Sequence, residues 1–320
     1  MIYEPKAQRV VYGETLKELG AEYKRLVVLD ADVSASTQSH FFAKAYPDRF
    51  FNCGIAEGNM VGIASGFAAS GLIPFASSFG FLVALRAGDD VRSFAAYNDL
   101  NVKLCGAYAG LSDFADGASH QTIEDIGVLR SLPNMKIFTP TDISTTRGAI
   151  RAMIDTEGPC YIRISREAVP ELHDAYETPV VPGKANVLRE GKDLTLAVCG
   201  SLLSNALQAA EMLEMEGVSA EVLEYTTVKP FDAETLIKSA KKTGCVFSVE
   251  EHNILGGFGS ACAEVLSEQC PVRLKRIGVR DKFGESGKYA ELLRANGLDA
   301  EGIYGTVKEN LNTQVMKKRF

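Results

Sequence analysis

The sequence lacks several features that would assign it at once to a common class of protein. It has no tryptophan and only four histidines in 320 residues, and its seven cysteines form no C-x-x-C pair. Scattered histidines and unpaired cysteines do not match the ligand spacing of a structural zinc site. We expect reduced core thiols at the cysteines that lie in apolar runs: Cys53, Cys105, Cys160, Cys199 and Cys245.

An excess of positive charge is also missing. The formal net charge is −7, which argues against a nucleic-acid-binding surface, so an anionic substrate would need a local cationic pocket. The first ten residues contain no basic and apolar signal pattern, and the longest apolar stretch is interrupted by Pro74. We therefore expect a cytoplasmic protein with no nucleic-acid partner and no membrane association.

A common nucleotide-binding motif and a common hydrolase motif are both absent. The sequence contains neither G-x-x-x-x-G-K-[ST] nor G-x-S-x-G, and residues 254–261 do not complete a dinucleotide fingerprint. What remains is an alternation of short apolar runs and helical patterns, which is typical of α/β proteins with parallel sheets. In the first half, the expected strands are "RLVVLDAD", "RFFNCGI", "LIPFASS", "NVKLCGAY", "MKIFTPTD" and "CYIRIS", and the expected helices are Arg9–Ala21, Glu57–Ser70, Phe79–Asn98, Thr122–Ser131 and Ile143–Thr156.

A second α/β set follows a segment with three prolines. Residues 167–192 have no sustained period and indicate a linker or crossover. The predicted domains are therefore 1–166 and 193–320, both doubly wound. In the second, the expected strands are "DLTLAVCG", "VSAEVLEY", "TGCVFSVEE" and "VRLKRIGV", and the expected helices are Leu202–Glu216, Ala233–Lys242, Gly259–Gln269 and Lys288–Asn296.

Glu57 is the only charged residue in the stretch from Phe50 to Ser70. One interpretation is a first-turn acid favoured by the helix dipole. The alternative is a desolvated carboxyl group at the start of a glycine-rich helix packed at a tight, intersubunit contact. Desolvation would raise the pKa of that carboxyl and let it donate a hydrogen bond as a neutral acid.

Other polar residues follow predicted strands, where open α/β sheets place their sites. Asp116 and His120 lie in a glycine-containing loop; the alternative is a capped turn with a surface histidine. Arg9, Ser36 and Arg166 stand at segment ends and suit phosphate binding, although each alone is more typical of an ordinary surface, so that only their convergence would indicate a site.

Taken together, several stretches resemble the C-terminal half of transketolases, over nearly the whole chain. They are "LDADVSAST", "FNCGIAEGNMVGIASG", "IPFASSF", "DGASHQTIEDIGVLR", "PNMKIFTPTD", "IRISRE" and "VKPFD…SVEEHNILGGFGS". The resemblance implies a pyrimidine-binding domain of a thiamine-diphosphate enzyme followed by a smaller transketolase C-terminal domain. The same pair of domains occurs in deoxyxylulose-phosphate synthase and in beta subunits of 2-oxoacid dehydrogenases.

The resemblance implies a role for each matching residue. Glu57 would hydrogen-bond the aminopyrimidine ring of thiamine diphosphate, and His120 would contact the reacting end of the donor and shuttle protons. Asp32 would lie beside the cofactor and Phe79 would stack on its pyrimidine. Asp116 would contact a substrate hydroxyl. The sugar phosphate would be held by Arg9, Ser36 and Arg166.

Some positions depart from the family pattern. Tyr108 stands where transketolases usually have a phosphate-binding histidine, and Phe114 and Ala115 replace part of the usual "GEDG". Leu82 and Leu85 occupy cofactor-pocket positions expected to carry aromatics. The resemblance therefore implies an aliphatic cofactor pocket and a substrate that differs from the standard ones.

The Gly-Asp-Gly motif that holds Mg²⁺ and the diphosphate in these enzymes is absent from the sequence. The resemblance thus implies a separate partner subunit that carries this domain, and a two-plus-two complex in which this chain dimerises around residues 57–70. We expect a two-carbon ketol transferase that is active only with its partner. A 2-oxoacid-converting subunit and a non-catalytic partner that keeps the fold are the alternatives.

Overall fold

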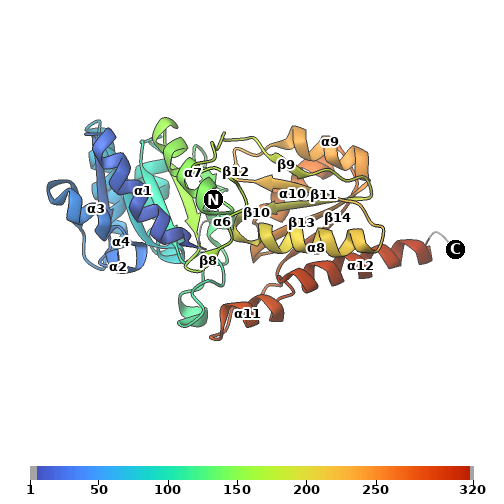
Figure 1. Ribbon diagram of the computed structural model, residues 1–320. Helices are drawn as coiled ribbons and strands as arrows, with labels where there is room; N and C mark the ends of the chain where they lie inside the picture. The colour runs from blue at the N-terminus through green and yellow to red at the C-terminus, as the bar shows by residue number, and fades with distance from the viewer. Residues whose placement is uncertain (1–5, 318–320) are drawn as a thin grey trace.

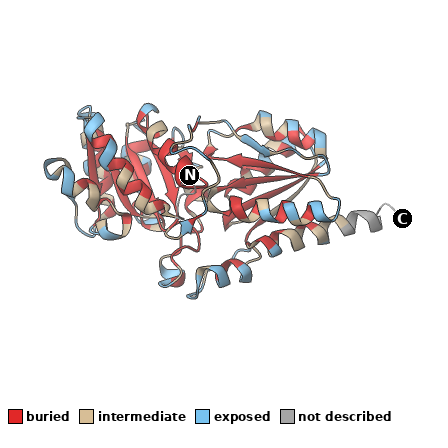
Figure 2. Ribbon diagram, in the orientation of Figure 1, coloured by how far each residue is buried: buried red, intermediate tan, exposed pale blue. Residues whose placement is uncertain are grey.

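The computed structural model describes the backbone of residues 6–317 and the side chains of residues 6–311. Two α/β units lie side by side, one built from the N-terminal half and the other from the C-terminal half (Figure 1). In both units the central strands are buried and the outer helix faces are exposed (Figure 2). The predicted fold class is confirmed.

The first unit contains a seven-stranded sheet in the order β12-β6-β7-β5-β4-β2-β3. All neighbouring strands are parallel except β12, which is antiparallel to β6. Continuous Val, Ile, Leu and Phe runs suit strands that are covered on both faces. The strands are β2 (Leu26–Asp30), β3 (Phe50–Asn52), β4 (Ile73–Phe79), β5 (Lys103–Ala107), β6 (Lys136–Phe138), β7 (Cys160–Ile164) and β12 (Thr227–Lys229).

Helices cover both faces of this sheet. One face carries α1 (Gln8–Glu22), α3 (His40–Ala45) and α7 (Ile143–Asp155). The other carries α4 (Glu57–Ala69), α6 (Asp125–Leu129) and two π-helical segments. The π-helical segments are η2 (Leu82–Arg86) and η3 (Val91–Ala96), and the remaining short helices are α2 (Ser34–Thr37), η1 (Pro47–Arg49), α5 (Gly88–Asp90) and η4 (Gly117–Ser119).

The second unit contains a five-stranded sheet in the order β14-β13-β10-β11-β9, parallel except for β9. The strands are β9 (Asn186–Arg189), β10 (Leu194–Cys199), β11 (Ala220–Tyr225), β13 (Cys245–Asn253) and β14 (Arg273–Val279). Its helices are η5 (Gly200–Leu202), α8 (Leu203–Met215), α9 (Ala233–Thr243), α10 (Phe258–Gln269), α11 (Tyr289–Ala295) and α12 (Ala300–Lys317). A two-stranded ribbon joins β1 (Lys6–Ala7) to β8 (Ala168–Val169).

The structure differs from the expected elements in several places. The helix expected over Phe79–Asn98 is instead the end of β4 followed by η2, α5 and η3. The sequence pattern did not predict α12 and β12, and the segment 167–192 contains β8 and β9. On α4, the expected apolar face included Ile63, but that side chain is exposed while Val61 is buried.

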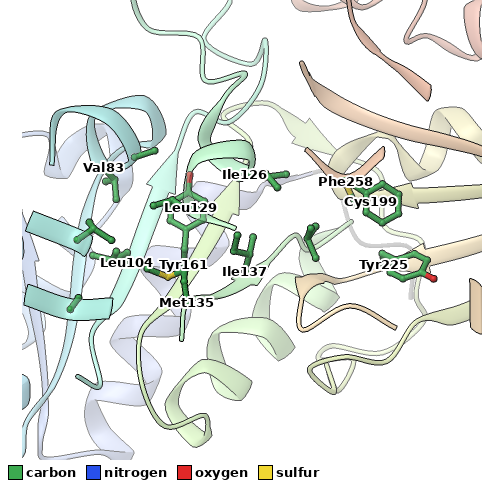
Figure 3. Close-up of a cluster of buried hydrophobic side chains, with 14 of the residues drawn as sticks. Val83, Leu104, Ile126, Leu129, Met135, Ile137, Tyr161, Cys199, Tyr225 and Phe258 are labelled. Carbon is green, nitrogen blue, oxygen red and sulfur yellow. The ribbon is translucent and has the colours of Figure 1, made fainter. Parts of the chain in front are cut away.

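The two units share one hydrophobic core. Residues of the first unit, such as Leu104 and Ile137, belong to the same buried cluster as Tyr225 and Phe258 of the second (Figure 3). Strand β12 extends the first sheet although it lies in the second half of the sequence. The units are therefore packed as one body. None of the helices described is both long enough and apolar enough to span a bilayer.

All seven cysteines are free; six of them are buried, and Cys53 is partly exposed. Burial raises the pKa of the Cys199 and Cys262 thiols well above their ordinary value. Because the thiolate is the reactive form, these two thiols are inert core groups. The sequence predicted reduced core thiols at five cysteines. Four of them, Cys105, Cys160, Cys199 and Cys245, are free and buried, and the fifth, Cys53, lies at the margin of the core.

Candidate active site

The predicted site residues gather at one edge of the first sheet. Its parallel strands all end at this edge, and most are followed by a residue singled out above. Asp32 and Ser36 follow β2, and Glu57 follows β3 at the start of α4. Phe79 is the last residue of β4. Tyr108 and its loop follow β5, and Arg166 follows β7. The carboxyl ends of parallel strands form ligand sites in open α/β sheets.

Glu57 is buried, with 1% of its surface exposed. It is the first residue of α4, and the Ser78 hydroxyl lies 3.5 Å from its Oε1. Ser78 belongs to β4 and directly precedes Phe79. The carboxyl group is therefore withdrawn from water at a helix N-terminus, as one of the two sequence interpretations required.

The Glu57 carboxylate has a cationic partner from outside the stretch between Phe50 and Ser70. Arg86, the last residue of η2, places Nη1 3.3 Å from Glu57 Oε2. A buried carboxylate without a partner is costly, and Arg86 supplies that partner here. Arg86 itself is 56% exposed, so its side chain has room to leave. The pair is not evident from the sequence because Arg86 lies 29 residues after Glu57 and reaches it only where η2 packs on α4.

Two arginines converge on one ring. The guanidinium carbon of Arg9 lies 5.5 Å from the centroid of Tyr108, and that of Arg166 lies 5.1 Å from it. Arg9 also donates a hydrogen bond to the Ser36 carbonyl oxygen at 3.1 Å. Its Nε is buried and has no partner among the residues described. The arrangement is a cationic cluster with an unused donor, which suits a tetrahedral anion.

Tyr108 has a backbone φ of 62°, in the left-handed region. Non-glycine residues adopt this conformation infrequently, and it is concentrated at functional sites. Here it follows directly on β5, and the phenol ring lies 5.5 Å from the Arg9 guanidinium carbon and 5.1 Å from that of Arg166. The residue that departs from the family pattern thus occupies the centre of the cationic cluster.

An acidic pair adjoins this cluster. Arg166 Nη1 lies 2.9 Å from Oδ1 of Asp113, which is fully buried. Burial and then the neighbouring charge of Asp116 raise the pKa of Asp113 to about 6, while Arg166 opposes the shift. Asp116 is exposed. Sequence reasoning singled out Asp116 and missed Asp113, although both lie in the same loop.

His120 lies against two aromatic rings. Its ring centroid is 5.6 Å from that of Phe79 and 5.6 Å from that of Phe81. Its Nδ1 lies 2.9 Å from the Ser119 hydroxyl. Phe79 also contacts Tyr108, with centroids 4.9 Å apart. The histidine is therefore positioned beside the cationic cluster rather than on a remote surface.

The three remaining cofactor candidates, Leu82, Leu85 and Asp32, differ in how far they are exposed. Leu82 is 7% exposed and Leu85 is 50% exposed, both on η2. Asp32 is exposed, has a φ of 65°, and accepts a hydrogen bond from the Asn52 side chain at 2.8 Å. The edge thus presents a buried carboxyl group, an aromatic ring and aliphatic side chains. These groups fit a flat aminopyrimidine, which needs a hydrogen-bonding partner and apolar packing surfaces.

The same edge offers no evident site for a metal. Within the described part of the chain, no group of three or more histidine, cysteine or acidic residues is placed to hold a cation. The residues present therefore fit the pyrimidine end of thiamine diphosphate.

Comparison with known proteins identifies both units. Residues 4–171 match the family "Transketolase, pyrimidine binding domain", and residues 183–303 match "Transketolase, C-terminal domain". A solved structure described as "Split gene transketolase, inactive beta4 tetramer" superimposes with a TM-score of 0.89 at 46% identity, covering 96% of this chain and 98% of that one.

Two curated relatives extend over similar lengths. The 6-deoxy-6-sulfo-D-fructose transketolase subunit SqwH of a Clostridium species is 40% identical over 94% of this chain and 93% of its own. A subunit of the apulose-4-phosphate transketolase of Phocaeicola vulgatus is 38% identical over 95% of this chain and 97% of its own. The domain matches and these full-length similarities show that the chain belongs to the transketolase family.

Proposed function

We propose that this chain is the C-terminal subunit of a split transketolase, which transfers a two-carbon ketol unit between phosphosugars in a thiamine-diphosphate-dependent reaction. The observation that carries the proposal is the convergence of buried Glu57 and the Arg9–Tyr108–Arg166 cluster at one sheet edge. The full-length similarity to subunits of other transketolases supports it.

Thiamine diphosphate, when bound, supplies the nucleophilic carbon for ketol transfer. This chain would hold the pyrimidine end: Phe79, Leu82 and Leu85 would pack on the ring, and Asp32 would lie beside it. Glu57 would hydrogen-bond a ring nitrogen. Arg86 would leave the carboxyl group when the ring enters, which its exposed position allows.

The remaining residues would act on the substrate. Arg9 and Arg166, with Ser36, would bind the phosphate, and the Tyr108 ring would separate the two guanidinium groups. Asp116 would accept a hydrogen bond from a sugar hydroxyl. His120 would contact the reacting end of the donor and move a proton there.

The partner in this proposal is an N-terminal transketolase subunit. It would carry the diphosphate-binding domain and the ligands for Mg²⁺, because the Gly-Asp-Gly motif is absent from this sequence. Each active site would then lie between the two kinds of subunit in a cytoplasmic two-plus-two complex. The domains within this chain would be 1–166 and 193–320, joined by 167–192.

Self-association would use the outer face of α4. A hollow of about 300 Å³ there is lined by small residues of α4 and by Phe94, Asn98 and Leu100. Large apolar side chains around it are exposed, among them Ile63, Phe94 and Tyr97. Exposed apolar clusters of this kind mark protein interfaces.

The proposal is tested by mixing. The full-length chain, the partner subunit and their mixture are assayed with thiamine diphosphate, Mg²⁺, a ketose phosphate donor and an aldose phosphate acceptor. We expect turnover only in the mixture. Turnover by this chain alone, or none in a mixture that has assembled, would contradict the proposal.

A second assay separates substrate classes. Two guanidinium groups and a hydroxyl-bearing residue suit a doubly charged phosphate better than a small 2-oxoacid. Ketose phosphate should therefore outcompete pyruvate by a large factor. A 6-deoxy-6-sulfo-fructose donor is included because a relative is named for it, and sulfonate shares the tetrahedral oxygen geometry of phosphate.

A further inference from the structure

The loop that carries Asp116 and His120 runs from Tyr108 to Glu124, between β5 and α6. In Figure 1 this loop lies next to the segment that leads into α11 of the second unit. Within the loop, Ser119 contacts both functional residues, donating to the Asp116 carbonyl oxygen and lying beside the His120 ring. Further hydrogen bonds from residues outside the loop hold it in place.

The beginning of the loop is fixed by Glu251 of β13. The Oε1 atom of Glu251 accepts a hydrogen bond from the Leu111 backbone N–H at 2.7 Å. Its Oε2 accepts hydrogen bonds from Ser201 and Tyr289, both at 2.8 Å and both in the second unit. Glu251 is 2% exposed, and its carboxylate therefore joins the loop directly to the second unit.

The middle and the end of the loop are fixed by the same unit. The Gly287 N–H donates to the Phe114 carbonyl oxygen at 3.0 Å, and the Gln121 side chain donates to the Glu285 carbonyl oxygen at 3.0 Å. The Asn253 N–H donates to the Ile123 carbonyl oxygen at 2.8 Å. The loop is thus held along its length by residues 251–253 and 285–287.

Arg163 of β7 strengthens this connection. Its Nη2 donates to the carbonyl oxygens of Thr122 and Glu251, at 2.8 and 2.7 Å, and its Nε pairs with Asp125 at 2.9 Å. One buried guanidinium therefore ties together the end of the loop, the start of α6 and β13. Buried networks in which each member is satisfied make a local structure rigid.

We propose that Glu251 is a positioning residue, which fixes loop 108–124 so that Asp116 and His120 meet the substrate in a productive geometry. The C-terminal unit would then contribute to catalysis without touching substrate or cofactor. The effect on turnover rests on the proposed function, whereas the effect on the loop does not. A displacement of about 1 Å in such a loop can lower a rate about a hundredfold.

Glu250 provides a matched control. It is also buried on β13, but it accepts hydrogen bonds from the Phe258 and Gly259 N–H groups of α10, within its own unit. Glu251→Ala and Glu250→Ala each remove a buried acceptor of backbone N–H groups. Only the former releases the loop. Glu251→Gln keeps an oxygen for the Leu111 N–H and serves as the conservative rescue.

The first measurement is amide hydrogen exchange on the isolated full-length chain. We expect exchange across residues 110–124 to be at least about tenfold faster in E251A than in E250A, and near wild type in E251Q. Equal exchange of the loop in E251A and E250A would overturn the proposal. Hydrogen exchange tests the positioning role independently of turnover. If the wild-type complex showed no ketol transfer, that result would contradict the proposed function and not the positioning of the loop.

The second measurement uses the reconstituted complex. We expect E251A to raise KM for the ketose phosphate and lower kcat, each by about tenfold, with E251Q close to wild type. A merely structural role would lower kcat with the folded fraction and leave KM unchanged, and that outcome would overturn the proposal.

A second variant perturbs the loop from the opposite side. A Cβ on Gly284 would clash with Gln121 Oε1, so Gly284→Ala must move the Gln121 side chain, which donates to the Glu285 carbonyl oxygen, whereas a Cβ on Gly305 meets nothing within 4 Å. We expect G284A to raise KM as E251A does and G305A to leave it unchanged. Identical KM values in G284A and G305A would count against the positioning role.

Discussion

The guanidinium of Arg166 contacts three groups: the rings of Tyr108 and Phe114, with centroids 5.1 and 4.7 Å away, and the carboxylate of Asp113. These contacts hold it in one orientation at the end of β7. Its side chain remains 26% exposed, so it can still accept an anion. Phe114 replaces a residue of the usual family motif and yet supports a phosphate-binding candidate.

We therefore expect Arg166→Ala to raise KM for phosphorylated donors about ten- to a hundredfold, because charge-assisted hydrogen bonds contribute about 1.5–3 kcal/mol each. Steady-state kinetics with a phosphorylated and an unphosphorylated ketose checks this. Arg280→Ala, an exposed arginine after β14, is the control. An equal loss with both ketoses would show that Arg166 does not bind the phosphate.

The sequence predicted which residues follow the strands, because a strand end can be recognised from its apolar run. It did not predict Arg86, Asp113 or Phe81, which reach the site through the irregular segments after β4 and β5. Side-chain partners across such segments depend on backbone turns that have no periodic pattern. Glu57 could thus be selected from sequence, but its cationic partner could not.

At the scale of elements, the segment between the units is fixed by His173. This side chain lies between two fully buried carboxylates, 2.9 Å from Asp142 at the start of α7 and 3.3 Å from Glu224 of β11. Hydrogen bonds to Asp142 and then to Glu224 raise the pKa of His173 to about 10. Proline content predicted an irregular segment here, whereas this ion cluster depends on tertiary contacts.

A raised histidine pKa stabilises the fold through the protonated form. The contribution is complete below the ordinary pKa of 6.5 and is lost as pH rises through about 10. We expect His173→Gln to lower the free energy of unfolding most at pH 6, with the difference from wild type shrinking steadily towards pH 10. Denaturant unfolding at several pH values measures it; a difference that does not change with pH would contradict the assignment.

The outer face of α4 is the surface proposed for self-association. A Cβ on Gly66 meets nothing within 4 Å, so Gly66→Lys should fold normally and place bulk and charge on the proposed interface. Gly305→Lys on α12, equally open, is the control. Sedimentation should show a smaller species for G66K alone. If G66K sediments like wild type, this face is not the interface.

At the scale of the whole molecule, the two units form one body, because they share a core and β12 joins the first sheet. The sequence predicted two successive α/β domains, since periodicity is local. It could not predict that the second half completes the first sheet, because β12 is three residues long and pairs with a strand about 90 residues earlier. The first sheet is therefore built from both halves of the chain.

The central claim is that this chain supplies a buried acid to a cofactor held jointly with a partner. The most direct test is ketol transfer by the reconstituted complex carrying Glu57→Gln, with assembly followed by sedimentation. Loss of the acid should lower kcat about a hundredfold or more, because a positioned proton donor contributes about 10²–10⁴ to a rate, while the complex still assembles. A Glu57→Gln complex that assembles and turns over within twofold of wild type would contradict the account.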